Sequence, residues 1–166
     1  MRLSSRLVIG AVAGMAGTMA MTMAMRRLHA RLPEEERYPL TPREIVDSAL
    51  DPDDEPARDL TVAAHFAYGA GCGALLAAAD PKPGVTRGAA AGVAVWLASY
   101  MGWIPALNLL KPANEHPARR NALMIAVHLV WGGATALALR ELGAARETIF
   151  RSGPDCDAPR GDRGGA

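Results

Sequence analysis

Two histidines, His65 and His128, are the side chains of this chain best placed to do chemistry, because each lies inside a long apolar stretch. Each begins the same short pattern, in which an aromatic residue follows three positions later and a glycine comes next, with Tyr68 in one copy and Trp131 in the other. Imidazoles inside apolar segments can hydrogen-bond between helices, relay protons or hold a polar solute. Two of them can also ligate a haem iron from opposite sides. The sequence predicts a polar centre made of these four side chains and leaves its role open.

The remaining candidates for chemistry are weak. The loop histidines, His29 and His116, lack the spacing of a zinc site, and the acidic run at residues 51–55 lacks the glycine and bidentate glutamate of a calcium loop, so no metal centre is predicted. The chain contains no hydrolase, zinc-protease or nucleotide-binding motif. We therefore predict no catalytic residue and expect a protein that is not an enzyme.

The elements that must position the two histidines are four apolar stretches without a charged residue. They cover residues 7–25, 60–79, 88–110 and 121–139. Crossing the hydrocarbon core of a bilayer takes about 20 residues at a rise of roughly 1.5 Å each. The sequence predicts an all-α, polytopic membrane protein with four transmembrane helices, whose partner is the lipid bilayer. The net charge of +1 and the 5% of aromatic residues give no footprint for nucleic acid.

Outside the apolar stretches the chain is short. The loop 26–59 is rich in charge and proline, and within it Thr41, Pro42 and Glu44 have the form of a capping box, which predicts a short amphipathic helix near residues 42–50. The turn at residues 80–84 predicts an antiparallel hairpin of the second and third spans. Residues 1–145 form the predicted membrane domain, and residues 146–166 are expected to be a disordered tail.

The spans also suggest a repeat of two similar hairpins. Gly10 and Gly14 open the first span as Gly88 and Gly92 open the third, while the histidine patterns recur in the second and fourth. If the repeat is real, a pseudo-two-fold axis along the membrane normal relates the hairpins, and the two histidines face each other across it.

Glycines spaced along the spans predict close helix packing, since small residues let helix backbones approach each other in lipid. The alternative use of these glycines is contact with a second copy or a membrane partner. The predicted packing positions are Gly10, Gly14, Gly17, Gly69, Gly88, Gly92 and Gly132.

Residues 65–142 resemble the YagU-like family of bacterial inner-membrane proteins, a family of unknown function. The matching features are His65 with its aromatic, the prolines of the turn at 80–84, residues 88–92, residues 105–112 and the segment from His128 to Trp131. Two departures stand out. The family tends to place an acidic residue shortly before the last histidine, where this chain has Asn121 and Ala122. It also tends to place another histidine late in the third helix, where this chain has Ser99 and Tyr100. The resemblance implies four spans, the inner membrane, and a role in envelope stress or acid tolerance, but no catalytic residue.

Location and function are expected from the same features. Arginine and lysine are nearly balanced between the two sides, and Arg2 and Arg6 at the first span favour cytoplasmic termini. We predict a small bacterial inner-membrane protein without enzymatic activity, which associates with itself or a partner, or passes protons or a small solute. The alternative is a haem-binding electron carrier that uses His65 and His128.

Overall fold

The computed structural model describes residues 1–48 and 55–153, and this part of the chain contains helices and no strand. The long helices are α1 (Leu3–His29), α3 (Glu55–Ala79), α4 (Val85–Ala98) and α6 (Ala118–Glu147), and two short ones are α2 (Thr41–Asp47) and α5 (Ile104–Ala106). Helix α4 continues through a π-helical turn, Ser99–Trp103, into α5. Four helical segments are thus long and apolar enough to cross a membrane, which confirms the predicted fold class.

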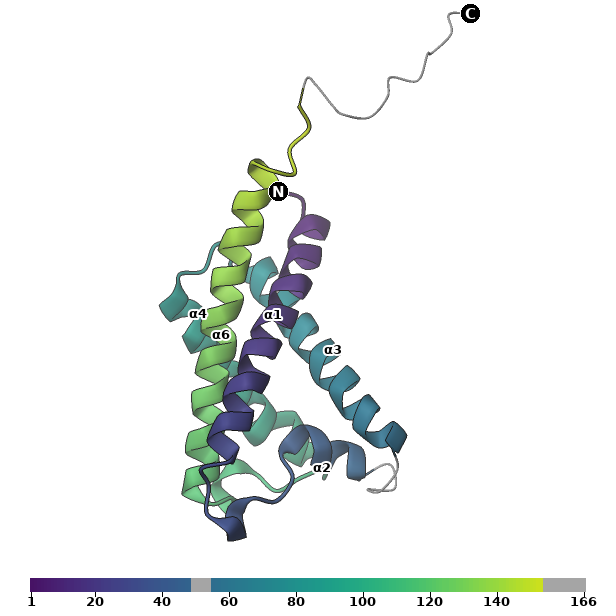
Figure 1. Ribbon diagram of the computed structural model, residues 1–166, viewed down its shortest axis with the longest axis vertical. Coiled ribbons are helices and arrows are strands. Elements are labelled where there is room, and N and C mark those ends of the chain that lie inside the picture. Colours follow the sequence, from purple (N-terminus) through teal and green to yellow (C-terminus); the bar gives the residue numbers. More distant parts are fainter. Residues whose placement is uncertain (49–54, 154–166) are drawn as a thin grey trace, which may run out of the picture.

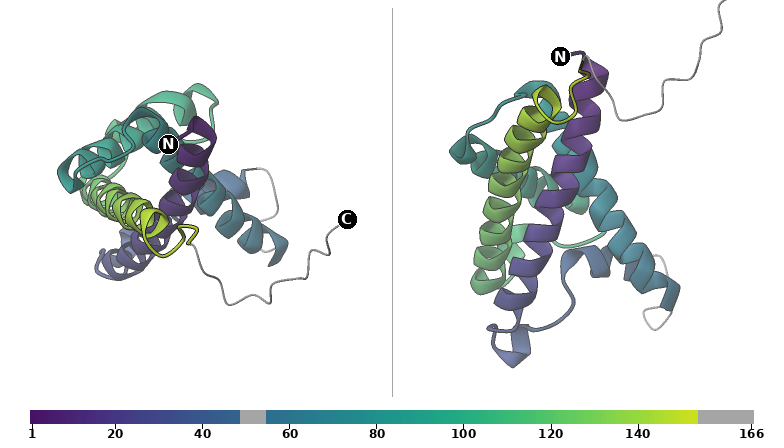
Figure 2. Two further views of the ribbon diagram at one scale, coloured as in Figure 1. Left: turned by 90° about the horizontal axis from the view of Figure 1, so that it is seen from above. Right: turned by 45° about the horizontal axis from the view of Figure 1, so that its top comes forward.

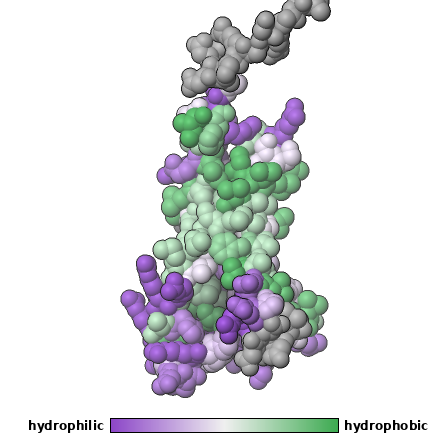
Figure 3. Space-filling view, turned by 45° about the vertical axis from the view of Figure 1, so that its right-hand side comes forward, coloured by the Kyte–Doolittle hydropathy of each residue, from purple (hydrophilic) through white to green (hydrophobic). Residues whose placement is uncertain are grey.

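The outer surface agrees with a membrane environment. Large apolar side chains point outward along the spans, among them Val8, Val12, Met15, Leu75 and Leu97. On the face shown in Figure 3, apolar residues form a band between two polar ends. Such a band can face lipid tails, while the polar ends lie at the level of the headgroups.

The helices form two antiparallel hairpins that pack side by side. Helix α1 packs on α3, α4 packs on α6, and α1 and α6 pack on each other, so that α3 and α4 are the outer members (Figures 1 and 2). The predicted hairpin of the second and third spans is therefore wrong, because the turn at residues 80–84 joins two helices that pack on other partners. The N-terminus and the end of α6 lie at one end of the bundle, and α2 lies at the other (Figure 1). We call these the terminal end and the α2 end.

Backbones touch where the predicted glycines lie. A Cβ atom added to Gly10 would lie 2.6 Å from the carbonyl oxygen of Gly73, and one added to Gly88 would lie 2.5 Å from the Cβ of Ala136. Gly17 faces the fourth span instead, 2.8 Å from the carbonyl oxygen of Trp131 by the same construction. At these positions no larger side chain fits without moving a helix.

These contacts align the two hairpins with each other. Gly10 meets Gly73 as Gly88 meets Gly132, and Gly14 meets Gly69 as Gly92 meets His128. By contact, His128 therefore corresponds to Gly69 rather than to His65. The alignment of the two hairpins by contact differs by one helical turn from the alignment that the repeated histidine pattern predicts. Close backbone contact, rather than the repeated sequence pattern, determines how the helices pair.

The third span runs from Val85 to Ala106 and so ends earlier than the predicted 88–110. Gly102 has non-helical dihedrals (φ −113°, ψ −108°), and Pro105 cannot donate the backbone hydrogen bond that a regular helix requires. Asn108 then adopts a left-handed conformation (φ 54°), and the N–H of Leu109 bonds back to the carbonyl of Ile104 at 3.2 Å. Asparagine is, after glycine, the common residue for such a C-terminal cap, so the helix ends at Ala106 although apolar residues continue.

Two loop predictions also change. Helix α6 runs through Glu147, so the first residues of the predicted tail are helical, while residues 154–166 lie outside the described part. Helix α2 covers Thr41–Asp47, and the predicted positions 49 and 50 also lie outside it. Its N-cap is Leu40 and no side chain caps it, so the predicted capping box is wrong. The Thr41 hydroxyl has another partner, described below.

Candidate functional site

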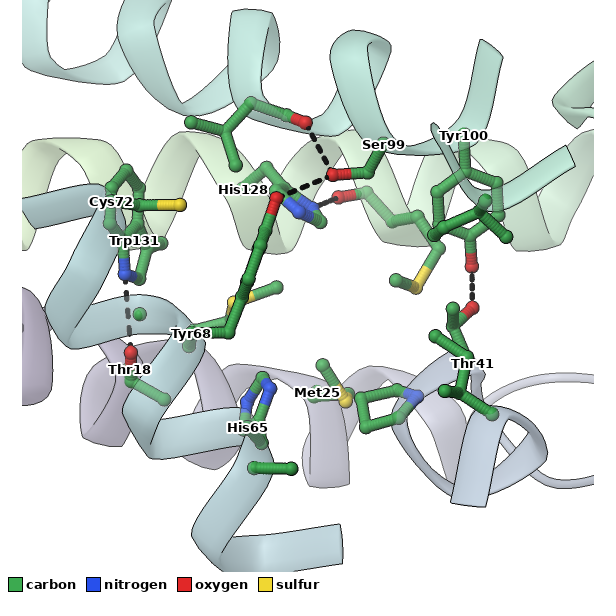
Figure 4. A pocket seen from close by; sticks show the side chains of 18 of the residues that line it. Thr18, Met25, Thr41, His65, Tyr68, Cys72, Ser99, Tyr100, His128 and Trp131 are labelled. Carbon is green, nitrogen blue, oxygen red and sulfur yellow. Dashed lines mark hydrogen bonds between the residues drawn. The ribbon is translucent and has the colours of Figure 1, made fainter. Parts of the chain in front are cut away.

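The bundle contains a cavity of about 280 Å³ toward the α2 end, and this cavity is partly open to the outer surface. All four residues of the predicted polar centre line it, namely His65, Tyr68, His128 and Trp131 (Figure 4). Helix α3 also contributes Cys72, and residues of α1, α2 and the third span add to the lining, including Thr18, Met21, Met25, Ile45, Val95, Ser99 and Tyr100. Side chains from all four spans therefore meet in one mainly apolar space that contains a few polar groups.

His128 is the buried histidine, and one of its ring nitrogens is already engaged. Its Nδ1 lies 2.7 Å from the carbonyl oxygen of Met124, one turn earlier in α6. A carbonyl can only accept, so Nδ1 must carry the hydrogen. In the neutral ring, Nε2 is then an acceptor on a residue that lines the cavity.

His65 is half-buried on α3 and is the less constrained of the two. Its ring meets that of Phe66 edge to face at 6.1 Å between centroids. Neither ring nitrogen has a hydrogen-bond partner among the described residues. The cavity is therefore lined by one imidazole with a fixed tautomer, that of His128, and by one that can adopt either tautomer, that of His65.

Tyr68 joins α3 to the third span across the cavity. Its hydroxyl lies 2.8 Å from Oγ of Ser99, and the Ser99 hydroxyl donates to the carbonyl of Val95 at 2.8 Å. The phenol is therefore the donor to Ser99. The Tyr68 ring also contacts that of Trp103, with 6.0 Å between centroids.

A second chain of two hydrogen bonds, like the one from Tyr68 through Ser99 to Val95, joins α6 to α1. Nε1 of Trp131 donates to Oγ1 of Thr18 at 3.2 Å, and the Thr18 hydroxyl donates to the carbonyl of Gly14 at 2.8 Å. Each pair of hydrogen bonds thus ends on a backbone oxygen. Both aromatic donors are satisfied within the protein, which leaves the histidine nitrogens as the polar groups with capacity for a ligand.

Helix α2 closes the α2 end of the cavity. Thr41, Pro42, Ile45 and Val46 contribute to the lining, and the hydroxyls of Thr41 and Tyr100 hydrogen-bond to each other. Tyr100 belongs to the π-helical turn, where the widened backbone turns its ring toward α2. Such π-turns are frequent at functional sites, and this one contributes Ser99 and Tyr100 to the cavity wall.

Arg120 anchors the loop that carries α2, and the sequence analysis missed it. Only 3% exposed, it donates to the carbonyls of Tyr38 (3.0 Å), Pro39 (3.0 Å) and Glu36 (3.3 Å). Its guanidinium lies 3.5 Å from the centroid of the Tyr38 ring and 3.8 Å from a carboxylate oxygen of Glu44. Its place in the first turn of α6 was the available signal, since the helix dipole disfavours a cation there.

The surroundings of Arg120 also change the ionisation of Glu44. Burial raises the pKa of Glu44, while the positive charge of Arg120 and that of His116 partly offset the effect, and neighbouring Asp47 adds to it. The docked α2 thus holds a carboxyl group that ionises less readily than a free one.

Metal ligands do not gather in the described residues, where no three histidine, cysteine or acidic side chains come together. His29 and His116 instead bond the carbonyls of Tyr38 (3.3 Å) and Lys111 (3.0 Å). The haem alternative stays a prediction, resting on the fact that both remaining histidines border one cavity.

Comparison with known proteins adds no name to these residues. No family model, curated protein or solved structure matches the chain. The resemblance to the YagU-like family therefore stays a prediction, and any function has to be argued from the cavity itself.

Proposed function

We propose that this chain is a non-enzymatic integral membrane protein of the bacterial inner membrane that holds a small solute inside its helix bundle. The observation that supports the proposal is the cavity of about 280 Å³ lined by residues of all four spans. An apolar cavity of roughly 150 Å³ can hold benzene, and ligand pockets begin at about 300 Å³. A solute with the size of two fused rings is therefore the natural occupant.

The cavity is distinct from its surroundings. At the terminal end the backbones of Gly14 and Gly73 approach so closely that an added Cβ would lie 3.0 Å from the facing Cα. Protein interiors are close-packed, and voids larger than a water molecule are few. A space of this size beside backbones in contact is thus better explained as a binding site than as loose packing.

The arrangement of hydroxyl groups favours binding over catalysis. Activated nucleophiles need a base within hydrogen-bond reach. Here Ser99 and Thr18 donate to the carbonyls of Val95 and Gly14, and neither hydroxyl bonds to a histidine. The groups around the cavity are therefore arranged to hold a molecule rather than to attack one.

The test fills the cavity. Cys72 lines it, whereas Leu75 on the same helix is 69% exposed on the outer face, so Cys72→Phe and Leu75→Phe form a matched pair. Ligand binding to the folded state raises its melting temperature. We expect naphthalene to raise the Tm of the wild type and of Leu75→Phe but not that of Cys72→Phe, in one detergent at equal concentrations.

Two outcomes would count against the proposal. An equal shift in all three proteins would mean that naphthalene acts through the detergent or the outer surface. If naphthalene, anthracene and toluene all left the Tm of the three proteins unchanged, the cavity would hold no such solute. The haem alternative instead predicts a visible absorbance band that His65→Ala abolishes.

A further inference from the structure

We infer that the solute is a mostly apolar molecule that carries one hydrogen-bond donor, a hydroxyl or an N–H, and gives it to Nε2 of His128. This inference rests on the proposed function, because it names the chemistry of the molecule that the cavity holds. Phenols and indoles are the class that it describes.

The acceptor follows from the tautomer of His128. Its Nδ1 is tied to the carbonyl oxygen of Met124 at 2.7 Å, so Nδ1 carries the hydrogen. The ring is buried among apolar side chains, including those of Met124 and Trp131, and burial without a counter-charge disfavours an imidazolium. The neutral ring then offers a lone pair on Nε2, and a buried acceptor favours a ligand that donates to it.

The two aromatic donors at the cavity leave His128 as an acceptor of fixed tautomer and His65 as a second histidine that the experiment has to distinguish from it. Trp131 and Tyr68 are themselves donors, and each is already bonded to a hydroxyl, at 3.2 Å to Thr18 and 2.8 Å to Ser99. A ligand with several polar groups would leave some of them without partners in an otherwise apolar space, at a cost. The described lining supports a ligand with one donor, and we assign the acceptor to His128 because its ring is more deeply buried than that of His65 and is fixed by the bond to Met124.

The rest of the lining suits an aromatic or aliphatic body. Met21, Met25 and Met124 contribute thioethers, which are flexible and make favourable contacts with aromatic rings. Tyr68 and Trp103 line the cavity and are also 44% and 38% exposed on the outer surface. The cavity therefore reaches the face that lipid covers, which agrees with a solute that dissolves in the bilayer.

The experiment compares two probes of nearly equal shape, indole and indene, of which only indole carries an N–H. Each is titrated against the wild-type protein in the same detergent, and the Tm shift gives its affinity. One hydrogen bond corresponds to roughly a fivefold difference in affinity. We expect indole to bind about fivefold more tightly than indene, and His128→Leu to remove the preference while His65→Leu retains it.

The outcomes separate the two levels of the proposal. Equal binding of indole and indene by the wild type would overturn the donor inference and leave the solute-binding function standing. If His65→Leu lost the preference for indole and His128→Leu kept it, the acceptor would be His65, and the assignment to His128 would be overturned. Failure of both probes, together with naphthalene, would remove the proposed function itself. The wild-type comparison needs no variant, so it decides even if His128→Leu does not fold.

Discussion

The two ends of the bundle are built on opposite principles. At the terminal end, Gly10 and Gly88 bring helix backbones close together, and the side chains that face these glycines, those of Ala77 and Ala136, are small. At the α2 end, Trp96, Tyr100 and Trp131 hold the helices around a cavity. The comparison shows how one sequence can combine a rigid bundle with an internal space: small residues fix the crossing, and bulky residues beyond it keep the helices apart.

The first prediction breaks the close-packed end. A side chain at Gly14 would meet the carbon of the Gly69 carbonyl at 3.1 Å from its Cβ and the Cα of Gly73 at 3.0 Å. Backbone atoms cannot rotate away, so we expect Gly14→Leu to cost about 3 kcal/mol or more of unfolding free energy, or to prevent folding. Reversible unfolding in mixed micelles of a mild detergent and dodecyl sulfate measures the loss.

Gly71 provides the control for that experiment. It lies on α3, but a Cβ added there meets nothing within 4 Å. Gly71→Leu should change the unfolding free energy by about 0.5 kcal/mol or less. Equal destabilisation by the two variants would show that glycine contacts are not what holds the terminal end together.

The second prediction opens the α2 end and leaves the terminal end intact. Arg120→Met removes the donor from three backbone carbonyls and the partner from Glu44. We expect a loss of about 1–3 kcal/mol, confined to the docking of α2, because the removed bonds serve that loop. Hydrogen exchange should accelerate across residues 41–47 and stay slow in α1 and α6.

Arg119→Met is the matched control. The neighbouring Arg119 side chain is 68% exposed and lies 3.9 Å from Glu36, so its removal should cost about 1 kcal/mol or less. If exchange in α2 rose equally in both variants, the buried contacts of Arg120 would not be what docks α2.

How far the sequence could predict these regions differs between the two ends. The spans and the packing glycines follow from hydropathy and residue size, and the four cavity residues follow from polarity inside apolar stretches. Arg120 was missed, because its partners are backbone carbonyls that no sequence pattern reveals. The Thr41 hydroxyl was misassigned for the same reason. It hydrogen-bonds to the hydroxyl of Tyr100, far away in the sequence, instead of capping its own helix.

The smallest effect concerns pH, and it tests whether the α2 end responds to its surroundings. Burial raises the pKa of Glu44 above its ordinary value of 4.5, with Arg120 and His116 opposing the shift and Asp47 adding to it. The docked helix therefore holds the proton more tightly than the free one. The contribution of Glu44 to the docking of α2 is fully present below the ordinary pKa of a glutamate. It is lost as the pH rises through the raised pKa of Glu44 in the docked helix.

Hydrogen exchange of α2 between about pH 4 and pH 7, corrected for the intrinsic rate, should show docking that weakens as the pH rises. The charges of His116 and Asp47 also act on Glu44, so the wild-type slope alone does not identify the group. Glu44→Gln keeps the shape of the side chain and cannot ionise, which should flatten the part of the slope that belongs to Glu44. An unchanged slope in that variant would show that the pH response does not come from Glu44, and the docking of the helix that closes the cavity would then not depend on this carboxyl group.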